Sequence, residues 1–346
     1  AAQVSGRIED RGAQVLYENV GSRWNWGGSV SHLPYLSYDY TQGTDTRETV
    51  DGDRIPVTVF GRQRLRTYAE RAEAFLSYPF STTRRVEFTT GLTYYHFDRE
   101  RQELVFDDFG RLIERRTFDA RDPSSLTLVQ PSVALVEDSS FFGFTSPVEG
   151  SRARLEITPT FGSVRLQSVL ADLRRYFRLF DPSALAVRLM HFGRYGEGSD
   201  DERFTSLYLG YPTLVRGYDV NVFDEADCNG DECPEIDRLV GSRIGVVNLE
   251  WRVQILGSER YGVFDGGPLP TELVAFVDGG VAWSRDDSPV LTWDTDPRRH
   301  VPVFSAGLAL RTALCGALPI ELHFAHPFQR DDVDFVDFGF VIAPGW

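Results

Sequence analysis

Hydrophobic and polar residues alternate with a period of two along most of this chain, and a 3.6-residue period is nearly absent. In the segment 319–326, for example, Ile320, Leu322 and Phe324 share one face of a strand. Glu321 and His323 lie on the opposite face. Segments of this kind are about ten residues long, and about fourteen of them can be counted, which is typical of strands that cross a bilayer at a tilt. The pattern predicts an all-β chain.

The connections between these segments are of two kinds, and the two kinds alternate along the chain. Short turns are expected at 19–22, 81–83, 147–150 and 316–318, and long polar loops at 41–65, 101–122, 196–240 and 285–299. Barrels of bacterial outer membranes sort their connections in this way, with short turns in the periplasm and long loops outside the cell. We therefore expect a transmembrane antiparallel β-barrel in an outer membrane, with residues 1–346 as one domain.

Composition is compatible with that prediction. The 346 residues suffice for one large barrel, and the 25 Phe and 14 Tyr suit strands and interfacial girdles. A net charge of −15 argues against nucleic-acid binding. Mean hydropathy is −0.26, which does not exclude a barrel, because only alternate residues of each strand face lipid. All 36 basic residues are Arg, a good partner for carboxylates.

One arginine stands out beside a glycine in a long loop. Arg216 lies in the segment Val215–Tyr218, and each of the next two strand segments places one acid opposite its apolar side chains. These acids are Glu250 and Asp278, and the alternation of both strands predicts that their side chains point inward. The arrangement suggests an ion-paired latch that holds the loop inside a closed sheet, because a guanidinium can bind two carboxylates through its fork of donors.

The chain resembles the BamA/TamA-type outer-membrane assembly family (the bacterial surface antigen family), over its C-terminal sixteen-stranded barrel. The resemblance is best over roughly 125–346, and the order and spacing of its motifs are more specific than any one of them. The motifs are Phe144–Arg152, Val215–Tyr218, Leu249–Trp251, Phe276–Gly280, Ser305–Leu310, Pro319–Phe328 and the final strand that ends on Trp346.

Laid on the family pattern, residues 1–10 correspond to its third strand, and 13–19, 23–40, 66–80 and 84–100 to strands four to seven. The family's first two strands and its periplasmic module would then lie upstream of Ala1. A complete fourteen-stranded barrel is the alternative. In the family, clients are thought to insert at the seam between the first and last strands.

The resemblance also implies roles for particular residues. The arginine that corresponds to Arg216 reaches down the lumen to the two following strands, so Arg216, Gly217 and Tyr218 would form the latch with Glu250 and Asp278. One departure is the segment Leu209–Pro212, where family members often carry paired glycines.

Two cysteines lie four residues apart in the same long loop, around an Asn-Gly turn. Cys228 and Cys233 fit a disulfide-closed turn, and some family members have a disulfide in this loop. Free thiols remain possible, as does a calcium loop built on Asp227, Asn229 and Asp231, although the glycine and the closing glutamate of such a loop are missing. Cys315 is expected to be an inert strand residue.

The last segment places aromatic and aliphatic residues on one face. Phe340, Ile342 and Trp346 resemble the C-terminal signal by which barrels are recognised for assembly. A lipid-facing strand with an interfacial anchor explains the same pattern. The feature therefore indicates location and not activity.

The predicted function is non-catalytic: insertion or translocation of outer-membrane proteins through a lateral seam, with no metal or other cofactor. The expected partners are the lipid bilayer, lipopolysaccharide, and client or periplasmic accessory proteins. A membrane anchor for a periplasmic module such as a propeller is the alternative, and a diffusion porin is the third interpretation. An outer-membrane protease or acyl transferase would have to assemble its site from separate strands, since no G-x-S-x-G elbow occurs.

Overall fold

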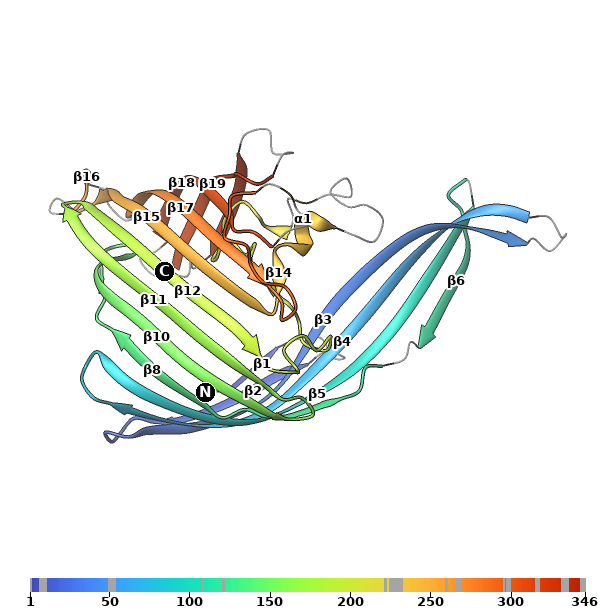
Figure 1. Ribbon diagram of the computed structural model, residues 1–346, viewed down its shortest axis with the longest axis horizontal. Coiled ribbons are helices and arrows are strands. Elements are labelled where there is room, and N and C mark those ends of the chain that lie inside the picture. Colours follow the sequence, from blue (N-terminus) through green and yellow to red (C-terminus); the bar gives the residue numbers. More distant parts are fainter. Residues whose placement is uncertain are drawn as a thin grey trace. The chain divides into compact units, whose positions relative to one another are not determined.

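Most of the described chain is in β-strands that pair almost entirely antiparallel, as the alternation predicts (Figure 1). The computed structural model describes residues 2–5, 11–48, 54–107, 109–119, 122–220, 223, 233–258, 261–265, 269–294, 296, 300–314, 318–330 and 336–342. By their internal contacts these residues form two compact units. Unit 1 comprises 1–76, 89–131 and 161–164, and unit 2 comprises 77–88, 132–160 and 165–346.

Unit 1 contains the first strands of the chain. They are β1 (Ala2–Ser5), β2 (Gly12–Asn19), β3 (Asn25–Glu48), most of β4 (Arg54–Pro79), most of β5 (Arg84–Asp107), β6 (Leu112–Asp119) and β7 (Leu126–Val129). β2 pairs with β1 on one side and β3 on the other, and β5 pairs with β6 and β7. Side chains of β3, β4 and β5 contact one another in that order, for instance where the Tyr68 ring stacks on both His32 and His96.

Unit 2 is a run of strands in which each pairs with the next. Its principal strands are β8 (Ser132–Asp138), β10 (Pro147–Gly162), β11 (Leu166–Phe180), β12 (Ser183–Tyr195), β15 (Arg243–Gly257), β17 (Thr271–Trp283), β18 (Val303–Leu314), β19 (Leu318–Pro327) and β20 (Asp337–Ile342). Its short elements are β9 (Phe141–Phe142), β13 (Leu207–Tyr208), α1 (Pro234–Asp237), β14 (Val240–Gly241) and β16 (Phe264–Asp265). The antiparallel pairing runs β8–β10–β11–β12–β15–β17–β18–β19–β20.

Burial follows the two-residue alternation closely in unit 2. In β15 the even-numbered residues from Ile244 to Gln254 are buried, whereas Val247, Leu249 and Trp251 on the other face are exposed. Apolar residues therefore cover the outer face of this sheet, and several of the charged residues lie on its inner face. This is the reverse of a soluble sandwich, in which the apolar face is the buried one.

Two expectations about connections are wrong. Residues 41–48, 54–65, 101–107 and 112–119 lie in strands β3 to β6 and not in loops. These segments are rich in charged and polar residues and so resemble loops in sequence, but they pair across strands: Arg64 and Arg66 of β4 bind Glu100 and Asp98 of β5. β3, β4 and β5 are 24, 26 and 24 residues long, not about ten.

The turn expected at 147–150 lies slightly earlier in the chain. β10 already begins at Pro147, and the amide of Gly143 donates to the carbonyl of Ser146 to close the turn. Turns at 19–22 and 81–83 are present, and 315–317 lies outside the described residues. The difference matters because residues 143–147 face the inner side of unit 2.

Candidate functional site: the Arg216 loop and its buried charges

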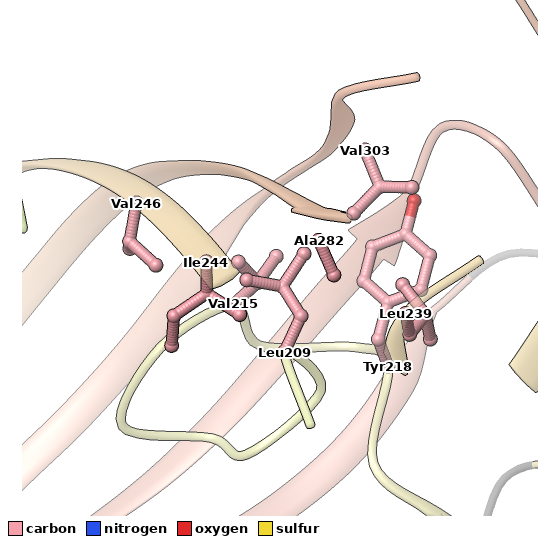
Figure 2. Packing of buried hydrophobic residues seen from close by; sticks show 8 residues of the cluster. All are labelled: Leu209, Val215, Tyr218, Leu239, Ile244, Val246, Ala282 and Val303. Atoms are coloured by element: carbon pink, nitrogen blue, oxygen red, sulfur yellow. The ribbon is translucent and has the colours of Figure 1, made fainter. Parts of the chain in front are cut away.

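The segment 196–242, which we call the Arg216 loop, joins β12 to β15, and the residues of it that the structure describes fold back over the inner face of unit 2. Leu209, Val215 and Tyr218 are each 0% exposed. They pack with Leu239 and with inward side chains of β15, β17 and β18, which are Ile244, Val246, Ala282 and Val303 (Figure 2). An apolar contact therefore brings the loop onto the sheet and places Arg216, one residue beyond Val215, at the sheet surface.

Glycines make this close approach possible. A Cβ at Gly280 would lie 2.7 Å from Leu209 and 2.9 Å from Val215, so the loop packs directly on the backbone of β17. Gly217 has a φ of +85°, in the left-handed region that favours glycine. Gly210 lies against the carbonyl of Tyr218, where a Cβ would collide with that oxygen. The Leu209–Pro212 segment thus retains one glycine at the position where the loop crosses itself.

Arg216 binds three carboxylates from three strands. Its Nε and Nη2 donate to Asp278 of β17 at 2.7 and 2.9 Å. Nη2 lies 2.9 Å from Glu250 of β15, and Nη1 lies 3.1 Å from Glu321 of β19. The structure therefore brings together the three residues that the sequence paired, and adds Glu321.

The guanidinium of Arg216 is buried away from solvent. Arg216 is 3% exposed, and its Cζ lies 3.6 Å from the centroid of the Phe276 ring. Burial disfavours the charged form, but the attraction of Asp278 and Glu250 outweighs it and raises the pKa of Arg216. A cation on an aromatic face, with carboxylates at its edge, is a geometry that arginine supports better than lysine.

Two further arginines complete the cluster. Arg252 contacts Glu250 through Nε at 2.8 Å and Nη2 at 2.7 Å. Arg311 of β18 lies 2.5 Å from Glu321 and 3.4 Å from both Glu250 and Glu272. Both guanidiniums are nearly inaccessible to solvent. Glu250 is thus shared by all three arginines.

The cluster contains one more carboxylate than guanidiniums, and neutral donors lie at two of its acids. The amide of Asn248 donates to Asp278 at 2.8 Å. The hydroxyl of Ser146 lies 2.9 Å from both carboxylate oxygens of Glu272. Hydrogen bonds of this kind lower the cost of burying an ionised group. The chemistry is therefore that of a structural ion network.

Tyr218 ties the loop to the end of β19. Its hydroxyl lies 3.0 Å from both the carbonyl of Phe304 and the side-chain oxygen of Gln329. Burial raises the pKa of the Tyr218 phenol, so the group stays protonated and can donate. Arg238, next to α1, donates to the carbonyl of Gln329 as well.

Sequence reasoning missed Glu321, Arg311, Glu272 and Ser146. The parity of β19 places Glu321 on the polar face, and Arg311 interrupts the apolar and small residues of β18, so a signal existed for both. Nothing comparable marks Ser146, because a serine in a turn is ordinary. The contact of Ser146 with Glu272 could be found only from the fold.

Other predicted residues lie away from this cluster or outside the described chain. Phe340 and Ile342 are 52% and 58% exposed on the outer face of β20, and Trp346 is outside the described residues. Cys233 immediately precedes α1, but Cys228 is not among the described residues, so the disulfide stays a prediction. Cys315 and the proposed calcium-loop residues Asp227, Asn229 and Asp231 also lie outside them.

Within the described part of the chain, no group of three or more His, Cys, Asp or Glu side chains could hold a metal ion. Among the same residues, no helix is long and apolar enough to cross a membrane. The four acids of the cluster are interleaved with arginines and are arranged for ion pairing.

Comparison with known proteins identifies the family. A model of the Omp85 superfamily domain matches residues 36–343. The chain belongs to the Omp85 superfamily. The match covers the strands of unit 2 up to β20 and the whole Arg216 loop, so the buried ion network lies within the Omp85 domain.

Two solved structures are similar to the chain. BamA from Haemophilus ducreyi, in a crystal structure lacking POTRA domains 1–3, is similar with a TM-score of 0.55 and 14% identity, over 99% of this chain and 68% of that one. CdiB from Acinetobacter baumannii is similar with a TM-score of 0.47 and 15% identity, over 98% of this chain and 58% of that one. A sequence search among curated proteins gives no significant match. The Omp85 domain is thus an outer-membrane β-barrel fold of the BamA kind.

Proposed function

We propose that this Omp85 domain is the membrane barrel of a factor that inserts or translocates outer-membrane proteins. The observation that carries the proposal is the buried Arg216, bound by Asp278, Glu250 and Glu321 inside an Omp85 domain. The Arg216 loop would act as a latch that keeps the lumen occupied. A lumen filled in this way is poorly suited to a diffusion porin, whose function needs an open channel.

The mechanism we propose is mechanical and needs no catalyst or cofactor. Client strands would enter at a lateral seam between the first and last strands of the barrel. The exposed Phe338, Phe340 and Ile342 of β20 would face the bilayer and lipopolysaccharide beside that seam. An edge strand in lipid has unsatisfied backbone groups, which a client strand could pair with transiently. Long loops would lie outside the cell and short turns in the periplasm.

A reconstituted folding assay tests this proposal. Lipid vesicles with and without the chain would receive a small urea-denatured outer-membrane barrel, and its folding would be followed by heat-modifiable gel mobility. We expect faster folding in vesicles that contain the chain. Equal rates would contradict the insertase and favour a membrane anchor for a periplasmic module.

Conductance measurements distinguish a diffusion porin from the proposed insertase. In planar bilayers we expect the chain to be closed most of the time, because the Arg216 loop would occupy the lumen. A large, steady conductance in the unmodified chain would instead support a diffusion porin.

A further inference from the structure

A second segment enters the inner face of unit 2, and it reaches the same ion network as the Arg216 loop. Residues 143–147, which we call the 143–147 segment, comprise the turn before β10 and the first residue of that strand. Ser146 and Val148 are each 2% exposed, although Phe141 and Phe142 just before them are exposed. A turn with a buried polar tip is unusual, because turns normally lie at the surface.

Three polar contacts hold this segment against the sheet. The Ser146 hydroxyl lies 2.9 Å from both carboxylate oxygens of Glu272. Arg252 donates to the carbonyl of Pro147 at 3.0 Å. The hydroxyl of Thr145 donates to Gln254 at 3.4 Å. The segment is therefore bound to β15 and β17 from inside the sheet.

The two segments enter from opposite ends of the strands. The Arg216 loop leaves from Tyr195 at the end of β12 and returns at Arg243 at the start of β15. The 143–147 segment precedes β10, whose Gly150 pairs with Tyr176 of β11, near the β11–β12 turn. That turn lies beside the far end of β15, since Ser183 pairs with Val253.

Arg311 connects the two sets of contacts. It binds Glu321, which also binds Arg216, and it contacts Glu272, which also binds Ser146. Glu250 provides a second connection, because it contacts Arg216 on one side and Arg252 on the other. Loss of a central group would leave buried charges unpaired toward both segments.

We propose that the 143–147 segment is a second latch, coupled to the Arg216 loop through Arg311. The two latches hold the inner face from its two ends, and each is more stable when the other is bound. Coupling between sites is reciprocal, so release of either segment must weaken the binding of the other, and the factor is the same in both directions.

Hydrogen exchange of the full chain in lipid vesicles, read by mass spectrometry, tests the coupling. We expect Arg311→Gln to raise exchange about tenfold in peptides from both 209–218 and 143–148, because charge-assisted hydrogen bonds are lost at both ends. Arg188→Gln disturbs the Arg216 loop at a contact outside the network. Arg188 is also buried and donates to the loop carbonyl of Thr213 at 2.9 Å, but its carboxylate partner is Asp172. Because release of either latch weakens the other, we expect it to raise exchange in 143–148 as well as in 209–218. The control is Arg64→Gln in unit 1, which should change exchange in neither segment.

The reciprocal variant is Ser146→Ala, a small change at the tip of the second latch. We expect it to raise exchange in 209–218 as well as in 143–148. A local effect only, or an effect of Arg311→Gln on one segment only, would overturn the proposal. Heat-modifiable gel mobility shows whether each variant folds. If Arg311→Gln does not fold, Arg311→Lys, which keeps the charge, replaces it in the exchange experiment. No client is present, so the outcome is independent of the insertase test.

Discussion

Arginine–carboxylate pairs occur in both units of the chain, but their surroundings differ. In unit 2, Arg216, Arg311 and Glu250 have side chains that are at most 3% exposed. In unit 1, the pair Arg64–Glu100 has side chains that are 22% and 29% exposed. The chemistry of the pairs is the same, so the comparison isolates the effect of burial.

The difference shows what each set of pairs can do. Charges at a partly exposed position keep part of their hydration, so forming or breaking the pair changes the stability less than in a buried network. Buried charges have lost that hydration, and removal of one partner leaves the other without compensation. The pairs of unit 2 can therefore hold a loop in one arrangement, whereas those of unit 1 connect neighbouring strands.

The largest effect should follow from the acid that all three arginines share. We expect Glu250→Gln to lower the free energy of unfolding by about 3–5 kcal/mol, because it leaves buried guanidiniums without their common carboxylate. Glutamine keeps the volume of the side chain. Urea titration in lipid vesicles, followed by tryptophan fluorescence, measures the change. A loss below about 1 kcal/mol would place the Glu250 pairs in the same class as exposed ones.

Arg216→Gln should cost somewhat less, about 3 kcal/mol, near the lower end of the range for a buried pair. Asp278 would keep the donor of Asn248, and Glu321 would keep Arg311. The same titration measures the loss. Arg216→Lys is the informative control: it retains the charge but not the fork of donors, and we expect it to recover only part of the stability. Full recovery would mean that charge alone holds the loop.

The packing of the loop gives a test that involves no charge. We expect Gly280→Ala to destabilise the chain by about 1–3 kcal/mol, because the new methyl group overpacks against Leu209 and Val215. Gly245→Ala is the matched control in β15, where the nearest atoms to the added Cβ are 3.8 Å away. Urea titration compares the two. Equal losses would show that the loop is not packed on β17 as described.

The alternation of the sequence sufficed to predict the inner and outer faces of unit 2. Parity placed Glu250 and Asp278 inward, and a glycine-flanked arginine in the preceding loop suggested their partner. The odd or even position of a residue tells which face of the sheet its side chain lies on, but not where along the strand it meets the neighbouring strands. It therefore does not tell which inward acids lie beside one another. That Glu321 and Arg311 lie beside Asp278 and Glu250 is therefore known only from the register of β17, β18 and β19.

The long strands of unit 1 were missed for a different reason. Sequence periodicity detects a strand by the contrast between its faces, and this contrast disappears where both faces are polar. In β4, residues 62–67 contain one apolar residue, Leu65, among three arginines, Gln63 and Thr67, so the segment reads as a charged loop. Cross-strand pairing with β5 makes it a strand, and such pairing is not visible in one segment alone.

The smallest effect should come from unit 1 itself. We expect Arg64→Gln to change the free energy of unfolding by only about 0.2–1 kcal/mol, since Glu100 can regain water when its partner is removed. Raising the salt concentration should reduce this difference further, because exposed pairs are screened, and should leave the Glu250→Gln loss nearly unchanged. Titrations at low and high salt measure both. If the two variants showed the same salt dependence, burial would not be what separates the two units, and the loop of unit 2 would need another explanation for its fixed position.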